Sequence, residues 1–423
     1  MKKEDIPFYN EAVLPYHWLK SAIYGVANGF PAKKLRVIGV TGTNGKTTTC
    51  FMVWKMLNEA GHKAGVMTTV GWGVDKIEKQ IEHMTTVDCG DMNRRIKKII
   101  DDGAEFLVLE ISSHALSQFR DLGIPIEIAV MSNVTHEHLD YHKTCERYRD
   151  AKRKLFKKAK HGVINADDRS ASFFSTDVED KLTYGIKHGK VKATEIKLKA
   201  DGVEYIVKQQ GKDDLRIQTQ IAGEFNVYNS LAAVCVGRIL GLKDSEIADG
   251  IYALESVEGR MMSINEGQDF SVIIDFAHTP DAFEKLFDSL RGTVDGRIIV
   301  VHGGAGRRDE AARYERGEIM GREADIIIIT EDDSRDEDPM RIAGMFVEGA
   351  EREGKTKDKD LFIEIDRPKA VELAFKKAKK GDLVLLLGKG HEKTLLRGTG
   401  EIPYLEEDIA RKTLKKLGYS KKK

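Results

Sequence analysis

The chain has 423 residues, more than one hydrophobic core usually supports, so two or three domains are expected. Its 68 lysines and arginines balance its 68 aspartates and glutamates, which argues against a nucleic-acid binder with a clustered basic excess. The four cysteines form no CxxC pair and no zinc-binding spacing, which favours a reduced, cytoplasmic protein. The longest apolar runs have the length of strands, so no segment is expected to span a bilayer.

Residues 1–34 form a short N-terminal segment without the continuous apolar core of a signal peptide. Within it, WLKSAIYGVANGF (18–30) is compatible with an amphipathic helix. Two interpretations of this helix are open. Packing on its own domain is favoured, and contact with a membrane surface is the alternative.

Residues 35–257 are expected to form a central P-loop domain with a parallel α/β sheet. Strand-like runs alternate there with helical stretches, as in a parallel sheet, where functional groups collect at the carboxyl ends of the strands. Residues 180–222 instead show the alternation and turns of a small antiparallel patch attached to this domain. The strand-like runs are LRVIGV (35–40), FLVLEI (106–111), IEIAVMSNV (126–134) and GVINADD (162–168).

Residues 258–423 are expected to form a C-terminal Rossmann-like α/β domain. Each of its strand-like runs continues into polar or glycine-rich residues, so this sheet is also predicted to carry functional groups at the ends of its strands. The lysine-rich end, SKKK (420–423), is predicted to be a frayed terminus. The strand-like runs are FSVIIDFAH, RIIVVHGG, ADIIIITEDD, KDLFIEI and GDLVLLLGKGHE.

A phosphate-binding loop is predicted where the first strand ends, in VIGVTGTNGKTTT (37–49). The strict pattern GxxxxGK[ST] fails by one position, because its first glycine would fall on Val40. The physical parts are present: a buried strand, a glycine turn, Lys46 for the phosphates, and Thr47 for Mg²⁺ where a helix begins. A strand before the turn and a helix after it therefore indicate nucleotide binding.

Two further strand ends carry polar residues that suit the same site. Glu110, in LEISSHALSQFR (109–120), is placed to reach a Mg²⁺ ion held by the neighbouring loop. Asn133 ends another strand in SNVTHEHLDYH (132–142), a stretch that also contains three histidines. A zinc cluster is disfavoured, because no cysteine joins these histidines at ligand spacing.

These motifs resemble those of the Mur ligase family, the ATP-dependent amide ligases of cell-wall precursor synthesis. Within the family the resemblance is closest to the tripeptide-forming type, which extends a UDP-N-acetylmuramoyl-L-alanyl-D-glutamate acceptor by one amino acid. It runs from about residue 35 to 410. The motifs that carry it are GTNGKTT, HMTT, LEISSHALSQFR, NVTHEHLDYH, RYRDAKRKLF, GEFNVYN, GRM, IIDFAHTPDAF and GKGHE.

The resemblance implies a mechanism and its ligands. ATP's γ-phosphate would pass to the acceptor's carboxylate, and the incoming amine would attack the acyl phosphate and expel phosphate. Two Mg²⁺ ions would offset the crowded negative charge, with Thr47 and Glu110 on one ion and His138 on the second. The implied ATP-binding residues are Gly42, Thr43, Asn44, Gly45, Lys46, Thr47, Thr48, Asn133, Asn226, Asn229, Arg260, Asp275 and His278.

Lys152, in RYRDAKRKLF, resembles the lysine that this family carbamylates with CO₂. The modification converts a cation into an anionic oxygen ligand for Mg²⁺. Without the flanking pattern, Lys152 would be one of several lysines on the solvated face of a basic helix. With that pattern a catalytic and metal-binding role is favoured, alongside Lys46, Glu110 and His138.

The resemblance also implies that the acceptor is a muramoyl-dipeptide, but the sequence departs from the family pattern in two places. The sequence reads MTTV where the family usually has an asparagine before the threonines, and the substantial N-terminal domain that holds the uridine diphosphate is essentially absent. Either the UDP end is held weakly or by a partner, or the acceptor is not a UDP-sugar. The implied acceptor-binding residues are Thr85, Thr86, Ser112, Gln118 and Arg120.

For the incoming amino acid, the family loop that is DNPR in diaminopimelate-adding enzymes reads DDSR here, at 332–335. Arg335 could pair in bidentate fashion with the distal carboxylate of diaminopimelate. The additional carboxylate of Asp333 could instead favour the ammonium of lysine, so diaminopimelate is favoured over lysine by a small margin. The implied amino-acid-binding residues are Arg313, Asp332, Asp333, Ser334, Arg335, Gly388 and Glu392.

Two other classes of function compete with this assignment. One is a related ligase that acts on another carboxylate, such as a folylpolyglutamate synthase-like enzyme or a ligase on a lipid-linked precursor. The other is a nucleotide-binding scaffold without catalysis, which the intact Lys46, Glu110, His138 and Lys152 oppose. The expected partners are small molecules, with no nucleic acid and with membrane contact through the N-terminal segment as a minor alternative.

Overall fold

The computed structural model describes residues 12–80, 82, 84–135, 137–199, 202–290, 294, 296–398 and 400–420. Residues 1–11 of the expected N-terminal segment, His83 and His136 of the quoted motifs, and residues 421–423 of the lysine-rich end lie outside this description. The chain divides into two compact units, Met1–Glu255 and Ser256–Lys423.

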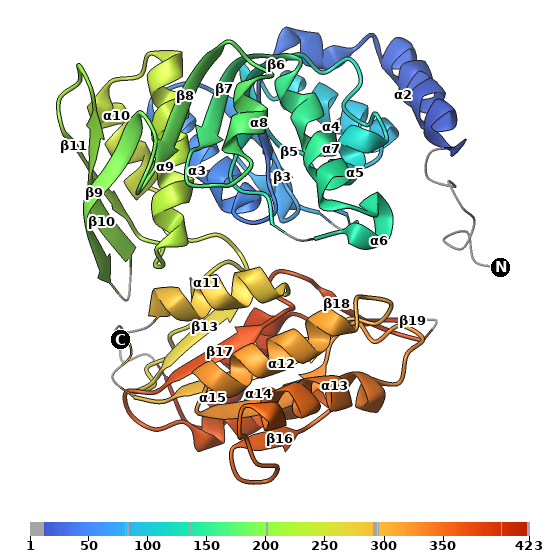
Figure 1. Cartoon of the computed structure of the whole chain (residues 1–423), viewed down its shortest axis with the longest axis vertical. Helices are drawn as coiled ribbons and strands as arrows, with labels where there is room; N and C mark the ends of the chain where they lie inside the picture. The colour runs from blue at the N-terminus through green and yellow to red at the C-terminus, as the bar shows by residue number, and fades with distance from the viewer. Residues whose placement is uncertain are drawn as a thin grey trace. The chain divides into compact units, whose positions relative to one another are not determined.

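The first unit is built on one sheet, which has eleven strands among the described residues (Figure 1). Their order is β11-β10-β9-β8-β7-β6-β1-β5-β2-β3-β4, with parallel pairing from β9 through to β2 and antiparallel pairing at both ends. The strands are β1 (Arg36–Thr41), β2 (Ala64–Met67), β3 (Gly71–Gly73), β4 (Ile77–Lys79), β5 (Phe106–Glu110), β6 (Ile126–Met131), β7 (Ala159–Asn165), β8 (Asp180–Gly185), β9 (Val191–Lys199), β10 (Gly202–Gln209) and β11 (Leu215–Thr219).

The central strands of this sheet are covered on both faces. Val37 and Ile38 point to opposite faces of β1 and are both fully buried, as expected for a parallel sheet with helices on each side. Side chains of α4, α5, α7 and α8 join the core on the face of Val37. The helices are α2 (Leu14–Asn28), the 3₁₀ helix η2 (Pro31–Lys34), α3 (Lys46–Glu59), α4 (Cys89–Asp101), α5 (Ser113–Ser117), α6 (Leu139–His142), α7 (Cys145–Phe156), α8 (Ala171–Ser175), α9 (Phe225–Leu240) and α10 (Asp244–Tyr252).

The antiparallel patch expected at 180–222 is present as β9, β10 and β11, but it continues the main sheet, and the first strand of this region, β8, is parallel. β8 pairs in parallel with both β7 and β9, and antiparallel pairing begins only between β9 and β10. The physical reason is that the edge of β8 presents backbone N–H and C=O groups that a following strand can pair. The predicted fold class, a mostly parallel α/β sheet with an antiparallel part, is confirmed.

The second unit has its own sheet, with the strand order β12-β13-β17-β14-β15-β16. All of its pairings are parallel except that of the short β12 with β13. Its strands are β12 (Met262–Ser263), β13 (Ser271–Asp275), β14 (Ile298–Gly304), β15 (Ile326–Glu331), β16 (Leu361–Ile363) and β17 (Leu383–Leu387), with a separate hairpin of β18 (Thr394–Arg397) and β19 (Gly400–Pro403). Its helices are α11 (Pro280–Leu290), α12 (Ala311–Glu323), α13 (Pro339–Arg352), α14 (Arg367–Lys377) and α15 (Glu406–Lys416).

The carboxyl ends of adjacent parallel strands bring together motifs that are far apart in the sequence. In the first unit β6, β1 and β5 are neighbours, and Val40 is in register with Glu110 and Val130. In the second unit β13, β17, β14 and β15 are neighbours, with Asp275 in register with Leu387. The polar ends of the predicted strand runs therefore lie along one edge of each sheet. Within the described part of the chain, no helix has both the length and the hydrophobicity that a bilayer crossing requires.

A buried ion pair anchors α14 and α15 to the carboxyl ends of the strands of the second sheet. The side chains of Arg367 and Glu406 are both 0% exposed, and Arg367 Nη2 lies 2.7 Å from a Glu406 carboxylate oxygen. Arg367 also donates hydrogen bonds to the carbonyls of Glu331 and Leu387, the last residues of β15 and β17. The hydroxyl of Tyr404 donates to the other Glu406 oxygen at 2.8 Å, so both carboxylate oxygens are hydrogen-bonded.

We expect Glu406→Gln to destabilise the second unit by about 3–5 kcal/mol, because it leaves the Arg367 guanidinium as an uncompensated buried charge. Hydrogen exchange at the backbone amides of α14 and β17, read by mass spectrometry on the whole chain, measures this loss. Glu407→Gln is the matched control, since it removes a partly exposed pair with Arg411 and should cost under about 1 kcal/mol. Equal protection in wild type and E406Q would show that the pair does not anchor the sheet.

Candidate active site

The loop after β1 has the backbone of an anion-binding turn. Gly42 and Gly45 have φ angles of 152° and 83°, which residues with side chains rarely adopt. A Cβ on Gly42 would lie 1.9 Å from Ser132 Oγ, and one on Gly45 would lie 2.3 Å from Asn229 Oδ1. Helix α3 begins at Lys46, so the N–H groups of its first turn face the loop and favour an anion there. The other predicted members of the loop are Thr43, Asn44, Thr47 and Thr48.

Asparagines from two other elements hold this loop in place. Asn133 Oδ1 accepts from the backbone N–H of Asn44 at 2.9 Å, and Asn133 Nδ2 donates to the Asn44 carbonyl at 3.0 Å. On α9, Asn229 Oδ1 accepts from the hydroxyl of Thr49 at 3.3 Å, while its amide nitrogen donates to Asn226 at 2.8 Å. Asn133 therefore fixes the backbone of the loop, while Asn229, which is held by Asn226, bonds a side chain of α3.

A threonine and a buried carboxylate meet beside the loop. Thr47 Oγ1 donates to Glu110 Oε2 at 3.0 Å, and the backbone N–H and hydroxyl of Thr69 donate to the same oxygen at 3.0 and 3.1 Å. Glu110 is only 2% exposed. Lys46 Nζ donates to the Thr43 carbonyl at 2.7 Å, which folds this cation back over the loop. A hydroxyl and a carboxylate are hard oxygen donors, so this pair fits Mg²⁺.

Lys152 lies beneath the phosphate loop rather than on the solvated face of its helix, α7. It is 1% exposed, and its Nζ donates to the Gly42 carbonyl at 2.6 Å. The same nitrogen lies 4.3 Å from the centroid of the Tyr148 ring. Burial, followed by the charge of Lys46, holds the pKa of Lys152 well below its ordinary value. The structure therefore places a readily deprotonated amine next to the phosphate loop.

The histidine-rich stretch forms an aromatic cluster next to this lysine. His138 has a positive φ of 55°, and its ring packs edge-on against His114 with centroids 4.7 Å apart. Its Nε2 lies 3.6 Å from a carboxylate oxygen of Glu137. His142 Nε2 is 3.0 Å from Ser113 Oγ, and burial followed by the charges of His114 and His138 lowers the pKa of His142 to about 3. His142 is therefore neutral at physiological pH and acts as a hydrogen-bonding partner of α5.

The residues expected to hold the acceptor gather between α4 and α5. Thr86 Oγ1 accepts from the backbone N–H of Ser112 at 2.9 Å, and Arg120 donates to the Thr86 carbonyl at 2.5 Å. Arg120 also donates to Gln118 Oε1 at 2.6 Å, and burial lowers the pKa of Arg120. Thr85 precedes Thr86 in the same turn and is half-buried. Four of the five predicted acceptor residues are therefore joined by hydrogen bonds.

In the second unit, the predicted nucleotide-binding residues surround one aromatic ring. Asp275 ends β13 and accepts two backbone N–H bonds at 2.7 and 2.8 Å, while burial raises the pKa of its carboxyl group. The guanidinium of Arg260 lies 4.5 Å from the centroid of Phe276, and His278 Nδ1 is 2.9 Å from the Phe276 carbonyl oxygen. The ring of His391, in GKGHE, packs 5.0 Å from the same ring.

Three carboxylates and one lysine form a buried cluster at the ends of β15 and β17. Asp332, Asp333 and Glu392 offer oxygen atoms within 4.8 Å of one another, as in some metal sites. Lys389 is fully buried among them, with its Nζ 2.8 Å from Asp333, 2.7 Å from Glu392 and 3.4 Å from Asp332. Burial lowers the pKa of Lys389, but these three carboxylates outweigh it and raise the pKa overall. The lysine ammonium offsets one of the three negative charges and lies within 3.4 Å of an oxygen of each carboxylate, in the position that a metal ion would need.

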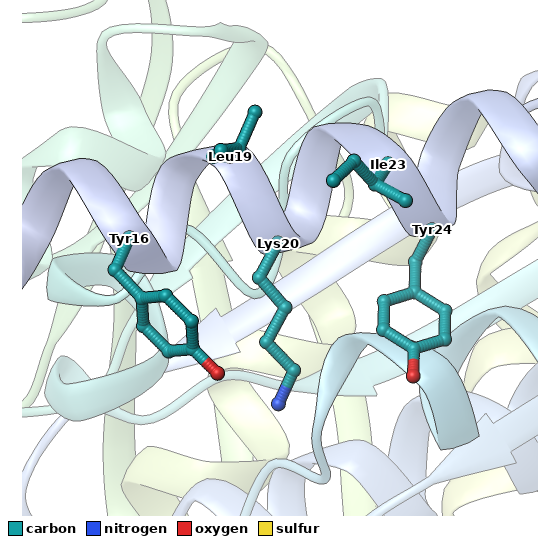
Figure 2. A pocket seen from close by; sticks show the side chains of 5 residues that line it. All are labelled: Tyr16, Leu19, Lys20, Ile23 and Tyr24. Carbon is teal, nitrogen blue, oxygen red and sulfur yellow. The ribbon is translucent and has the colours of Figure 1, made fainter.

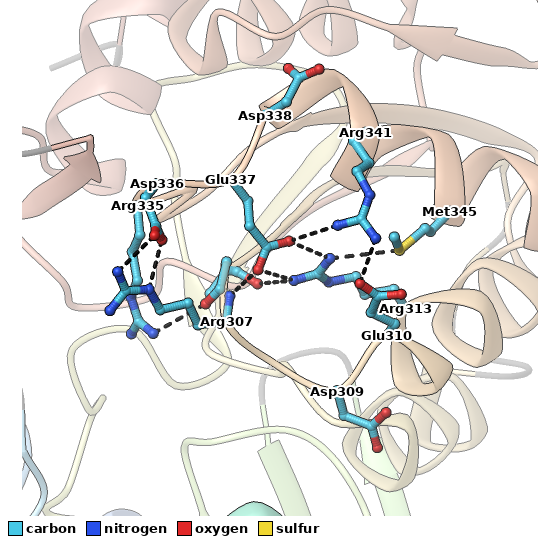
Figure 3. Close-up of polar contacts among 12 residues, drawn as sticks. Arg307, Asp309, Glu310, Arg313, Arg335, Asp336, Glu337, Asp338, Arg341 and Met345 are labelled. Carbon is cyan, nitrogen blue, oxygen red and sulfur yellow. Dashed lines mark hydrogen bonds and ion pairs between the residues drawn. The ribbon is translucent and has the colours of Figure 1, made fainter. Parts of the chain in front are cut away.

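Arg335 protrudes from the same loop with a positive φ of 55°. Its Nη1 donates to the Gly306 carbonyl at 3.1 Å, and burial followed by the charge of Arg308 lowers its pKa. Its acidic neighbour Asp336 pairs instead with Arg307, at 2.6 and 2.7 Å (Figure 3). The predicted neighbours Ser334 and Gly388 lie in the same region, and a Cβ on Gly388 would contact Asp332 Oδ2 at 2.9 Å.

Arg313 is more deeply placed than the other residues predicted for the amino acid. It is fully buried on α12, and its Nη1 donates to Glu337 at 3.0 Å while Nη2 donates to the Ala305 carbonyl at 2.9 Å (Figure 3). These bonds tie the loop after β14 to the loop after β15. Direct contact of Arg313 with an amino acid stays a prediction.

Three residues at these sites were not predicted from the sequence. Tyr148 hydrogen-bonds Thr43 Oγ1 through its hydroxyl at 3.1 Å and covers Lys152 with its ring. Thr69 holds Glu110, and Lys389 pairs with the acidic cluster. Two of the three had a usable signal: Tyr148 lies four residues before Lys152 and therefore on the same face of α7, and Lys389 lies within the GKGHE motif.

Comparison with protein families and with known proteins agrees with this geometry. The model of the Mur ligase middle domain matches residues 40–237, and that of the Mur ligase glutamate ligase domain matches residues 259–390. The two matches fall on the two units, and they include the phosphate loop, Glu110, Lys152, Asp275 and the DDSR loop.

Individual relatives extend the similarity over nearly the whole chain. A UDP-N-acetylmuramyl-tripeptide synthetase of Roseiflexus sp. (strain RS-1) is 37% identical, covering 95% of this chain and 82% of the relative. A UDP-N-acetylmuramoyl-L-alanyl-D-glutamate–2,6-diaminopimelate ligase 1 of Clostridium acetobutylicum is 37% identical, covering 92% and 80%. A solved structure of a ligase of the latter name is 29% identical, with a TM-score of 0.64 and coverage of 91% and 79%. The chain therefore belongs to the Mur ligase family, the ATP-dependent acid–amino-acid ligases that its motifs resemble.

Proposed function

We propose that this enzyme joins a diamino acid, diaminopimelate or lysine, to the D-glutamate carboxylate of a muramoyl-dipeptide, at the expense of ATP, in peptidoglycan synthesis. The observation that carries the proposal is the cluster around one phosphate loop of Lys46, the Thr47–Glu110 pair and the buried Lys152. The names of the relatives, a tripeptide synthetase and a diaminopimelate ligase, support the choice of acceptor and of amino acid.

The groups around the loop have the chemistry that phosphoryl transfer needs. The first turn of α3 and Lys46 would hold the phosphates of ATP, and Thr47 with Glu110 would hold one Mg²⁺. His138 and a modified Lys152, which both pack near Tyr148, would hold a second ion. Bound Mg²⁺ supplies a Lewis acid that offsets the charge between the transferring phosphate and the acceptor carboxylate.

Carbamylation of Lys152 fits its surroundings. The reaction requires a neutral amine, whose nitrogen forms a bond to the carbon of CO₂ and then loses a proton to leave an anionic carbamate. Burial and Lys46 favour the neutral form of the Lys152 amine. The nearby Lys46 cation would then attract the carbamate anion, so the same two lysines repel before modification and attract after it.

The acidic cluster favours diaminopimelate over lysine. Asp333 could attract the side-chain ammonium of lysine, but its Oδ1 already accepts from Lys389 Nζ at 2.8 Å and from the Leu396 N–H at 3.0 Å. That oxygen is therefore already engaged by hydrogen bonds within the protein. Arg335 has a planar guanidinium suited to a distal carboxylate, which diaminopimelate has and lysine lacks.

The proposed activity is tested by measuring phosphate release from ATP. The acceptor and the amino acid are added first separately and then together. A ligase should release phosphate at its full rate only when both are present, with the tripeptide product detected by mass spectrometry. ATP binding without stimulated turnover would point to a scaffold. Turnover with another carboxylate, but not with UDP-muramoyl-dipeptide, would point to the related ligase that acts on a different acceptor.

We expect Lys46→Ala to lower the ligation rate by at least about a hundredfold, because Lys46 would neutralise the transferring phosphate. Lys55→Ala, on the exposed side of the same helix, is the control and should retain wild-type turnover. The measurement is steady-state phosphate release with saturating substrates. Full activity of K46A would refute the assignment of the phosphate loop.

We expect Lys152→Ala to be nearly inactive and to be partly rescued by short carboxylic acids that replace the carbamate. Wild-type enzyme labelled with ¹³CO₂ should give a carbamate carbon signal by NMR that K152A lacks. Lys157→Ala, at the exposed end of α7, should keep both the activity and the signal. Wild-type activity in K152A, or an unchanged carbamate signal, would remove Lys152 from the mechanism.

We expect Arg335→Ala to raise KM for diaminopimelate roughly ten- to a hundredfold and KM for lysine little, since charge-assisted hydrogen bonds contribute about 1.5–3 kcal/mol. Arg341→Ala, on the neighbouring α13 and paired with Glu310, is the control and should change neither KM. An equal loss of activity with both amino acids would indicate that Arg335 has a structural role. Use of lysine by the wild type in preference to diaminopimelate would contradict the proposed substrate.

A further inference from the structure

Helix α2 carries an unusual share of the exposed apolar surface. Among the described residues, eleven large hydrophobic side chains are exposed, and six of them lie on this one helix. The other five are scattered over both units, as is normal for single surface residues. The six on α2 are Tyr16, Trp18, Leu19, Ile23, Tyr24 and Val26, with exposures from 40% to 70%.

Only a narrow stripe of α2 packs on the protein. Ser21 and Gly25 are its buried residues, and Lys20 forms an ion pair of 2.7 Å with Asp88 at the start of α4. The sequence-based expectation that the helix packs on its own domain therefore describes one side of it. On the remaining surface, Tyr16, Leu19, Lys20, Ile23 and Tyr24 line a groove and lie side by side along the helix (Figure 2).

The segment that contains this helix has an excess of basic residues, although Glu11 precedes it and Asp88 pairs with Lys20. Residues 12–34 contain three lysines, Lys20, Lys33 and Lys34, and no aspartate or glutamate. Lys33 and Lys34 form the last turn of η2, directly after α2, and both are exposed. An apolar helix surface with tyrosine and tryptophan, next to exposed lysines, is typical of a helix that lies in the interface of an anionic bilayer.

We propose that α2 docks this enzyme on the surface of an anionic lipid bilayer. The apolar side chains of α2 would enter the boundary between headgroups and acyl chains, and Lys33 and Lys34 would contact the negative headgroups. With 15 residues, α2 is about 22 Å long, so it would lie in the interface rather than cross it. The proposal is independent of the ligase reaction and adds to it a location for the enzyme.

A second copy of the chain fits this surface less well. One side of a helix about 22 Å long and about 10 Å wide offers roughly 200 Å², against about 800 Å² per partner in a stable protein interface. A symmetric dimer through α2 would also bring the lysines of each copy near those of the other, which like charges disfavour. A lipid surface has neither difficulty, because it is continuous and carries the opposite charge.

Co-sedimentation of the full chain with vesicles tests the proposal. Wild-type protein should bind vesicles of phosphatidylcholine and phosphatidylglycerol, and bind vesicles of phosphatidylcholine alone more weakly. The double variant Leu19→Glu/Ile23→Glu should lose about tenfold or more in partitioning, because both charges would enter the apolar boundary. Ile402→Glu, which changes an equally aliphatic exposed residue on β19, is the control and should bind as the wild type.

Two further readouts make the result decisive. Trp18 fluorescence should shift to the blue on adding the anionic vesicles, and the shift should vanish in Trp18→Phe. Ligase turnover with soluble substrates should be the same in the wild type and in the double variant, which separates failure of docking from failure of the proposed reaction. No vesicle binding, equal binding of the double variant, or a dimer in sedimentation velocity that the double variant abolishes would each overturn the proposal.

Discussion

The parallel register between β1 and β5 is the constraint on which the phosphate-loop region of the first unit depends. Val40 pairs with Glu110, so the phosphate loop starts beside a carboxylate that is buried at the end of the next strand. A buried carboxylate must be hydrogen-bonded or paired, and Thr47 and Thr69 supply those bonds. A shift of this register would separate the hydroxyl from the carboxylate and would also bury an unsatisfied charge.

In the second unit, ion pairs between side chains stabilise the buried charged groups. Lys389 forms ion pairs with Asp332, Asp333 and Glu392, and Arg367 pairs with Glu406 while it holds the ends of β15 and β17. These pairs lower the cost of burying several ionic groups at the carboxyl ends of this sheet. Arg335, at the end of the same loop, has a backbone carbonyl as a partner of its side chain, and its contact with an external carboxylate stays a prediction.

Two lysines of the first unit repel each other, and this repulsion affects the protonation of one of them. Lys46 and Lys152 both reach the phosphate loop, and the repulsion between them adds to burial in favouring the neutral amine of Lys152. The Tyr148 ring and hydroxyl link this amine to Thr43 of the loop. Helix α2 differs from the rest of the unit, since six of its large apolar side chains are exposed, whereas exposed ones elsewhere in the described part of the unit are scattered singly.

The sequence by itself determined the features that depend on neighbouring residues. Strand-like runs ending in Gly42, Glu110, Asn133 or Asp275, a helix starting at Lys46, and the order of the motifs were sufficient to predict two α/β sheets and the family. The roles of individual ligand residues remain predictions, because these roles depend on bound substrates.

Only the tertiary structure decided which distant groups meet. The contact of Tyr148 with Thr43 spans 105 positions and that of Lys389 with Asp333 spans 56, and neither follows from any local pattern. The burial of Lys152 and Arg313 does not follow from a local pattern either, because several of their neighbours in the sequence are charged. Charge and periodicity predict which residues favour water, but whether a lysine or arginine is buried depends on whether packing brings it an acceptor, such as the Gly42 carbonyl or Glu337.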